Sequence, residues 1–308
     1  MTTEQYLKNL QVPVGKVDVI LDTDAYNEID DQFAISYLLH SPEKVNVRAI
    51  CAAPFFNHHS TSPADGMARS YDEIINLLTL DGREDMKDKV YRGSETYLPD
   101  EKTPVESEAA RAIVDISKDY TADKPLYIVA IAAITNVASA FLLDQTLAER
   151  CVVVWLGGHA LHIPGHGANE FNMTQDIAGA RVLFNSGAPV VQLPCVGVVD
   201  AFTVSGPEFE AFFAHKNTLC DYLAKHVYDE VGGLDAHGGI WSRVVWDVTA
   251  AAWLCNEGNR FMSQTLIPAP IPQYDKYYSA DASRRLIAYV DHISRDSLLR
   301  DLAAKLTK

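Results

Sequence analysis

Acidic residues crowd into one short stretch near the start of this 308-residue chain. The stretch contains four aspartates within ten residues, namely Asp22, Asp24, Asp30 and Asp31. Carboxylates this close repel one another, so they persist together only where a cation neutralises them or where a site uses a shifted proton. Oxygen donors favour a hard ion such as Ca²⁺ or Mg²⁺. A helix cap with a polar turn would account for Asp30 or Asp31 but not for Asp22 and Asp24, so we interpret the stretch as a metal or catalytic site.

Alternating strands and helices are predicted around this stretch. Short apolar, β-branched runs recur at residues 17–21, 45–52, 126–131, 152–156 and 190–193. Apolar residues at helical spacing lie between them, at residues 30–39, 67–78, 106–118, 137–143 and 176–186. This order predicts an α/β fold with a doubly wound, mostly parallel central sheet. Ligands of such sheets bind beyond the carboxyl ends of strands, which is where Asp22 and Asp24 would lie.

The composition narrows the class of protein. Hydrophobic residues make up 48% of the chain, and no linker or repeat interrupts it, so we predict a single domain over residues 1–308. A formal net charge of -15 disfavours nucleic acid and anionic membranes as partners. Five widely spaced cysteines indicate reduced thiols rather than a disulfide framework. Without a signal peptide or a long apolar run, a cytoplasmic enzyme is the expectation.

Two glycine-rich segments are predicted to be loops. In the segment 157–167, the spacing of His159, His162 and His166 could hold zinc, although a loop histidine is more often solvated. The segment 231–239 is a predicted lid, and we expect an aromatic-rich helix start at 241–247 directly after it. His237 in that lid is a candidate acid for a leaving group; the alternative is a surface histidine in a glycine-rich turn.

Residues 22–31 resemble the N-terminal signature of the inosine-uridine nucleoside hydrolase family, an Asp-x-Asp followed by Asp-Asp at the end of the first strand. The resemblance continues in order along the chain. Residues 131–138 look like the family's Gly-Pro-Leu-Thr-Asn segment, 155–158 like its strand ending in two glycines, 169–172 like its Glu-Phe-Asn ribose motif, and 246–252 like its late aspartate at a helix start. The matches extend from about residue 17 to residue 255, so they cover most of the chain.

The resemblance implies a nucleoside hydrolase fold and Ca²⁺-dependent hydrolysis of the N-glycosidic bond of ribonucleosides, which releases ribose and free base. It implies that one Ca²⁺ is ligated by Asp24, Asp31, the backbone carbonyl of Thr135 and Asp247, with Asp22 supporting the metal shell. Asp24 would also deprotonate the metal-bound water. The family's usual assembly implies a homodimer or homotetramer.

The resemblance also implies which residues contact the substrate. Asp30, Glu170 and Asn172 would hydrogen-bond the ribose hydroxyls, and Asn27 and Asn57 are further candidates. Trp246 stands where the inosine-uridine branch has a histidine, which is similar to the purine-preferring branch. There an indole stacks on the base and makes it a better leaving group. The alternative for Trp246 is a core aromatic at a helix start.

Two departures from the family pattern leave other functions open. The turn 25–29 holds five residues where the best-known members have three, and the loop 159–168 lacks the usual asparagine before the Glu-Phe-Asn motif. A ribosyl hydrolase for a non-standard, nucleoside-like substrate is therefore one alternative. A calcium- and ribose-binding protein without turnover is another, which the full set of aspartates disfavours. A phosphatase of the haloacid dehalogenase type also has a strand-end Asp-x-Asp, but Tyr26 and Asn27 fit that family poorly.

Overall fold

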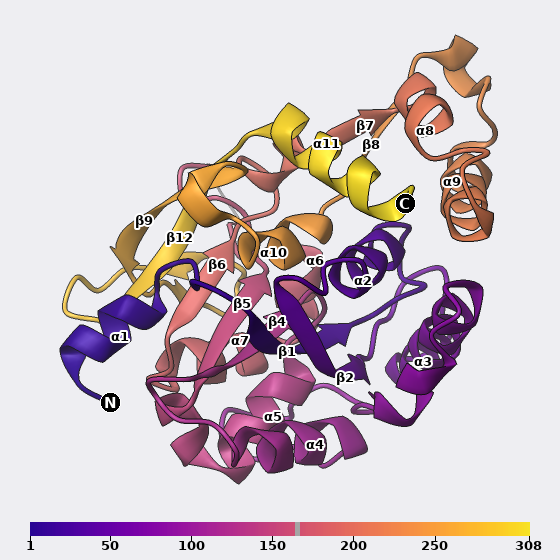
Figure 1. The fold of residues 1–308 in the computed structure, drawn as a ribbon. Helices are drawn as coiled ribbons and strands as arrows, with labels where there is room; N and C mark the ends of the chain where they lie inside the picture. Colours follow the sequence, from indigo (N-terminus) through magenta and orange to yellow (C-terminus); the bar gives the residue numbers. More distant parts are fainter. Residues whose placement is uncertain (164–166) are drawn as a thin grey trace.

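An eight-stranded sheet forms the centre of the computed structural model, which describes residues 1–163 and 167–308 (Figure 1). Its strand order is β3-β2-β1-β4-β5-β6-β12-β9. Every neighbouring pair is parallel except β12 with β9 at one edge. The strands are β1 (Val17–Thr23), β2 (Val45–Ala52), β3 (Val90–Tyr91), β4 (Leu126–Ala130), β5 (Cys151–Leu156), β6 (Val190–Leu193), β9 (Met262–Pro268) and β12 (Leu286–Ile293). The predicted doubly wound, mostly parallel sheet is confirmed.

Helices cover both faces of the sheet. One face carries α2 (Asp31–Leu39), α3 (Pro63–Leu80), α10 (Val248–Trp253) and α11 (Arg295–Leu306), and the other carries α4 (Glu108–Ser117), α5 (Thr135–Leu143) and α7 (Ile177–Asn185). Each face of the sheet has its own hydrophobic core, and alternate residues of β1 belong to different cores. Val19 and Leu21 pack on the first face and Ile20 packs on the second. Burial on both faces explains why these strands are almost continuously apolar in sequence.

The helix and strand predictions hold best where the pattern is local. All five predicted strands form, two of them with the predicted bounds, and all five predicted helices form. Helix α3 begins before the predicted start at residue 67, because the Ser62 side chain accepts a hydrogen bond from the Asp65 backbone N–H and Pro63 occupies the first turn. The helix start expected at 241–247 is wrong. Residues Ser242–Val244 form β8, which pairs antiparallel with β7 (Thr203–Ser205), and α10 begins only after Asp247.

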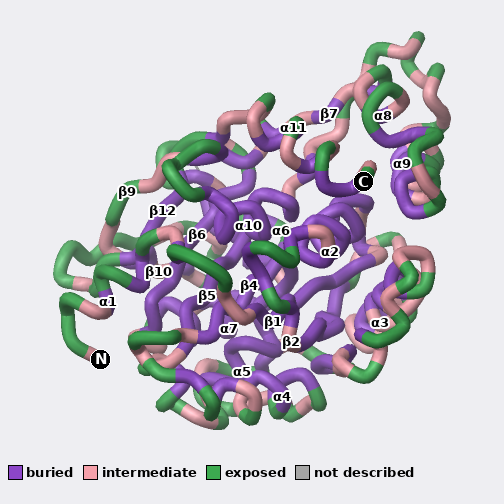
Figure 2. The backbone as a smooth tube through the Cα atoms, viewed as in Figure 1, coloured by how far each residue is buried: buried purple, intermediate pink, exposed green. Residues whose placement is uncertain are grey.

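Two helices project from this body as an outer lobe, α8 (Gly206–Phe212) and α9 (Thr218–Val231) (Figure 1). Much of their surface is exposed, in contrast to the buried strands (Figure 2). Side-chain contacts join α9 to α3, where the Tyr222 hydroxyl donates to Glu73 at 2.7 Å.

The smaller elements are α1 (Thr3–Asn9), α6 (Phe171–Gln175), β10 (Ile271–Pro272), β11 (Tyr278–Ser279), η1 (Glu84–Lys89), η2 (Gln145–Glu149), η3 (Val199–Ala201), η4 (Ala236–Gly239) and η5 (Glu257–Asn259).

Two sequence predictions about the whole chain can be compared with this fold. All five cysteines are free and buried, as predicted for reduced thiols. Among the described residues, no helix has both the length and the apolar character that crossing a membrane requires.

Candidate active site

A cavity of about 160 Å³ lies beyond the carboxyl ends of the central strands. Strand order reverses between β1 and β4, which is the position where open α/β sheets bind ligands. The lining includes six residues predicted from the sequence, Asn27, Asp30, Glu170, Asn172, Trp246 and Asp247. They come from the segments after β1 and β5 and from the segment before α10. The fold therefore gathers the motifs that the sequence places far apart into one pocket, which we call the carboxylate pocket.

Three of the aspartates form a compact group. Asp30, Asp31 and Asp247 each offer a carboxylate oxygen, and these atoms lie within 4.8 Å of one another. Asp30 and Asp31 stand at the start of α2, and Asp247 directly precedes α10. Two helix N-termini thus face the group, and their dipoles favour negative charge there. The Asp247 backbone N–H donates to the Asp30 carboxylate at 3.2 Å.

Asp24 is not one of these three residues, although the charges of Asp31 and Asp30 act on it. Asp24 is 1% exposed, and neither of its carboxylate oxygens has a hydrogen-bond partner among the described residues. One oxygen of Asp31 and one of Asp22 also lack a partner. Burial, followed by the charges of Asp31 and Asp30, raises the pKa of Asp24 well above its usual range.

These unpartnered oxygens fit a bound cation. Buried polar groups in folded proteins are almost always hydrogen-bonded, and buried carboxylates are paired with a cation or coordinate a metal. The donors here are all hard oxygens, which suits Ca²⁺ or Mg²⁺ rather than a soft metal. The site residues and the chemistry of a hard divalent ion therefore agree.

Two further side chains hold the aspartates in place, and the sequence alone did not single them out. The Thr23 hydroxyl donates a short hydrogen bond to Asp31. The Asn136 side-chain amide donates to Asp22 at 2.8 Å, and its oxygen accepts from the Ser94 backbone N–H at 2.8 Å. Burial raises the pKa of Asp22 to about 7 against the opposing effect of Asn136. The sequence feature that could have identified Asn136 is its position directly after Thr135 in the motif at 131–138.

Thr135 is buried as the first residue of α5, directly after the β4 strand and its loop. Its hydroxyl donates to Asp176 at 2.6 Å, which fixes the start of the helix. Ligation of a metal by the Thr135 backbone carbonyl stays a prediction.

The Glu-Phe-Asn motif is held rigidly by the backbone. Glu170 caps α6 and accepts hydrogen bonds from the backbone N–H groups of Gly158, Asn172 and Met173 at 2.8–2.9 Å. The Asn172 side-chain amide donates to the Leu156 carbonyl at the end of β5, at 3.1 Å. Both side chains line the pocket in orientations that their neighbours fix.

The long turn at residues 25–29 forms one wall of the pocket. Asn27 and Glu28 both line the cavity, and Glu28 pairs with Arg243 at 3.2 Å. Asn57 is not part of the lining: it lies behind the turn, and its side-chain amide donates to the Asn27 side-chain oxygen at 2.6 Å. The structure therefore gives Asn57 a position that orients Asn27.

Other predicted residues have mixed positions. Trp246 lines the cavity and is half-buried, with part of its ring packed against the core. His237 is exposed in η4 and is not part of the lining. His159 lines the cavity and His162 is exposed, whereas His166 lies outside the described residues. Within the described ranges, neither His159 nor His162 belongs to a group of three metal-ligating side chains.

Cys195 is a pocket residue that the sequence analysis missed. It follows β6, lines the cavity and is buried. Burial, with a contribution from Glu170, raises the pKa of its thiol well above the usual range, so the thiol stays protonated. The sequence feature that could have identified Cys195 is its position just after the predicted strand at 190–193.

Comparison with known proteins agrees with the family resemblance seen in the sequence motifs. The chain matches the family described as inosine-uridine preferring nucleoside hydrolase over residues 19–271. No curated protein sequence matches it.

Similar folds occur among solved structures. A plant nucleoside hydrolase has a TM-score of 0.76 at 20% identity, with 94% of this chain and 99% of that chain covered. An inosine-guanosine nucleoside hydrolase has a TM-score of 0.74 at 18% identity (94% and 98% covered), and a purine-preferring ribonucleoside hydrolase from Gardnerella vaginalis has 0.71 at 20% identity (94% and 98% covered). At these identities the likeness establishes the fold.

Proposed function

This chain belongs to the inosine-uridine preferring nucleoside hydrolase family, and we propose that it hydrolyses the N-glycosidic bond of ribonucleosides, with a preference for purines, in a reaction that depends on Ca²⁺. The observation that carries the proposal is Asp24, a buried carboxylate with two unpartnered oxygens beside Asp30 and Asp31. The family is metal-dependent, and the oxygen-only donor set fits the Ca²⁺ that the family resemblance implies.

Four residues would hold the ion: Asp24, Asp31, Asp247 and the backbone carbonyl of Thr135. When bound, Ca²⁺ would make a water molecule more acidic and orient the ribose hydroxyls. Asp22 would keep this arrangement in place through its hydrogen bond from Asn136.

Asp24 is our proposed general base. Because no group in the described part of the chain hydrogen-bonds either of its oxygens, one oxygen is placed to accept a proton from the attacking water. Cleavage of the glycosidic bond leaves positive charge on the ribosyl ring. Asp30 and Glu170 would stabilise this charge and bind the ribose hydroxyls together with Asn172 and Asn27. The three backbone hydrogen bonds to Glu170 fix its carboxylate before the substrate arrives.

The leaving base requires a partner of its own. We propose that the exposed part of Trp246 stacks on a purine base and lowers the cost of its departure. His237 remains our candidate for a side-chain acid. To protonate the base, the segment 231–239 must close over the pocket, since His237 is exposed and outside the lining in the present structure.

A substrate panel tests the proposal. The purified chain is incubated with inosine, guanosine, adenosine, uridine and cytidine, with Ca²⁺ or with EDTA, and free ribose is measured. We expect ribose release with Ca²⁺, faster from purines, and little release with EDTA. Absence of release from every nucleoside with Ca²⁺ present would refute hydrolysis of common nucleosides, and tight binding without release would support the non-catalytic binding protein.

The wall formed by the turn 25–29 favours one alternative substrate class. Asn27 and Glu28 add polar groups to the pocket, so a riboside with a modified base or a 5′ substituent is the second candidate. Such ribosides belong in the same panel. A single domain over residues 1–308, a homodimer or homotetramer and a cytoplasmic location remain predictions. The family match argues against a phosphatase of the haloacid dehalogenase type.

A further inference from the structure

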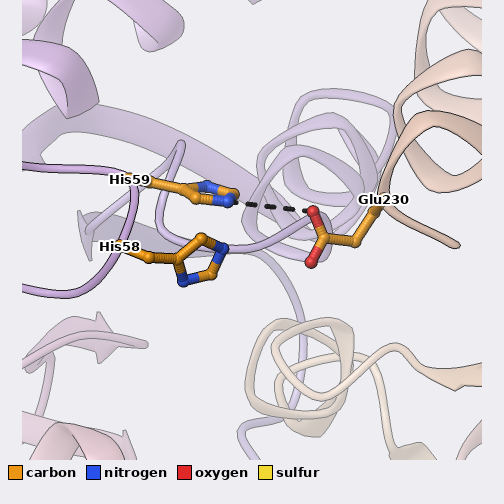
Figure 3. Close-up of side chains that lie close together, drawn as sticks. All are labelled: His58, His59 and Glu230. Atoms are coloured by element: carbon orange, nitrogen blue, oxygen red, sulfur yellow. Dashed lines mark ion pairs between the residues drawn. The ribbon is translucent and has the colours of Figure 1, made fainter. Parts of the chain in front are cut away.

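A second group of metal-ligating side chains lies outside the carboxylate pocket, between the loop after β2 and the end of α9. His58, His59 and Glu230 each offer one atom, and these three atoms lie within 4.8 Å of one another (Figure 3). We propose that this group, which we call the histidine site, binds one Zn²⁺ ion and thereby clamps α9 to the loop after β2.

The donor atoms suit zinc and differ from those of the carboxylate pocket. Two imidazoles and one carboxylate are a common zinc ligand set, whereas Ca²⁺ takes oxygen ligands. Ligand atoms that share a zinc ion lie roughly 3–4 Å apart, since each is about 2.0–2.2 Å from the metal. His59 Nε2 and Glu230 Oε2 are already 3.8 Å apart, and the rings of His58 and His59 have centroids 3.8 Å apart. Both rings reach from the loop toward Glu230 (Figure 3).

The hydrogen bonding of His59 favours a metal ligand. Its Nδ1 lies 3.3 Å from the Tyr26 backbone carbonyl. A carbonyl only accepts, so Nδ1 carries the hydrogen, and in the neutral ring Nε2 presents its lone pair toward Glu230. Metal-binding histidines commonly donate their other N–H to a carbonyl in this way. A lone pair and a carboxylate that face each other across 3.8 Å are placed to share a metal ion between them.

A further histidine lies near the histidine site on the same helix, outside the group of three ligand atoms. His226 precedes Glu230 by four residues on α9, so the two side chains lie on the same helical face. His226 lines the same cavity of about 330 Å³ as His58, His59 and Glu230. The three atoms of the histidine site would supply three protein ligands to zinc, and a water molecule would complete the tetrahedral set.

The one cation in this cavity is already compensated among the described residues. Arg69 lines the cavity, but its guanidinium pairs with Asp65 at 3.0 Å. Glu28 adds a second carboxylate to the lining. The charge of the cavity therefore does not oppose a divalent ion.

A clamp at this position would act on the carboxylate pocket through a short chain of contacts. The His59 backbone N–H donates to the Asn57 side-chain oxygen at 2.8 Å, and the Asn57 amide donates to Asn27. Asn27 lines the carboxylate pocket. An ion that joins His59 to Glu230 would thus hold the exposed end of α9 against the loop that positions Asn27.

Calorimetric titration of the full chain with Zn²⁺, in excess Ca²⁺, tests the proposal. We expect one Zn²⁺ per chain, with affinity reduced by roughly tenfold or more in His59→Ala and in Glu230→Gln. Amide hydrogen exchange at the end of α9 should slow with Zn²⁺ in the wild type and not in these variants. A Co²⁺-loaded sample should show visible d–d bands that both variants lose.

His215→Ala is the matched control. The His215 imidazole lies 3.5 Å from Glu210 in the same lobe, yet within the described ranges this pair belongs to no group of three ligands. Zinc affinity should not change in this variant. If His59→Ala does not fold, Glu230→Gln on the exposed helix face decides. The proposal is overturned if both variants retain zinc binding, if Ca²⁺ displaces the zinc, or if no zinc binds. In the last case His59 and Glu230 would be a simple ion pair.

Discussion

The carboxylate pocket and the histidine site share the turn at residues 25–29 but are built in opposite ways. Among the aspartates at the pocket, Asp24 is buried, and its oxygens have no partner within residues 1–163 and 167–308. In the histidine site, His58 and Glu230 are exposed, and His59 already has a hydrogen bond to the Tyr26 carbonyl. Burial of an unpaired charge is costly, whereas an exposed cluster is solvated when it is empty. The comparison indicates that the pocket depends on its ion, while an ion at the outer site only adds stability.

Asp24→Asn should have the largest effect, and it tests whether the carboxylate pocket depends on its ion. We expect kcat to fall by about 10²- to 10⁴-fold, since the proposed base is lost. In EDTA, however, the variant should unfold at a higher temperature than the wild type, because the cost of burying this carboxylate, or of protonating it on folding, is removed without loss of a hydrogen bond. Ribose release and thermal unfolding measure the two effects. Asp88→Asn, at an exposed carboxylate, is the control; a lower melting temperature for Asp24→Asn in EDTA would contradict the argument.

The pH dependence of the metal-free protein sharpens the same contrast. Burial raises the pKa of Asp22 and of Asp31 to about 7, from an unfolded value near 3.8. The folded state therefore binds these protons more tightly, so metal-free stability should decrease between about pH 4 and pH 7, by on the order of a few kcal/mol. Urea unfolding in EDTA measures this. Ca²⁺ should stabilise the protein increasingly as the pH rises. A metal-free protein that is equally stable at both pH values would show that these carboxylates are compensated by other means.

Asn136→Ala tests whether the support behind the aspartates matters. This variant removes the donor to Asp22 and leaves the Ser94 backbone N–H without its acceptor. We expect a loss of about 1–3 kcal/mol in unfolding free energy and a 10- to 100-fold lower Ca²⁺ affinity. Zinc binding at the histidine site should not change. Unchanged Ca²⁺ affinity in calorimetry would mean that Asp22 and Asn136 have only a structural role.

The smallest expected effect is at Trp246, whose burial is intermediate between that of the buried aspartates and that of the exposed histidine site. Stacking of aromatic rings contributes about 0.5–1.5 kcal/mol, so Trp246→Ala should lower kcat/KM for inosine by roughly two- to tenfold. Turnover of uridine should change little. An equal loss for both nucleosides would identify Trp246 as a core residue rather than a contact of the base.

Local patterns made most of the fold and part of the site predictable. The apolar runs identified β1 and β4, and the crowding of carboxylates identified Asp22, Asp24, Asp30 and Asp31 without any structure. Pairings between distant segments were not predictable. The β7–β8 pair joins Thr203 to Val244, so the sequence around 241–247 was mistaken for a helix start. The histidine site likewise combines a loop near residue 58 with Glu230, which only the folded chain brings together.

The position of β12 has a consequence for how the chain is made. This strand lies between β6 and β9, and it pairs in parallel with β6, which precedes it by almost 100 residues. During synthesis the ribosome completes β6 long before β12 emerges, so the nascent sheet exposes an apolar, unpaired edge in the interval. A chain that stops before residue 286 should therefore aggregate instead of forming a smaller folded protein, although every pocket aspartate is already present.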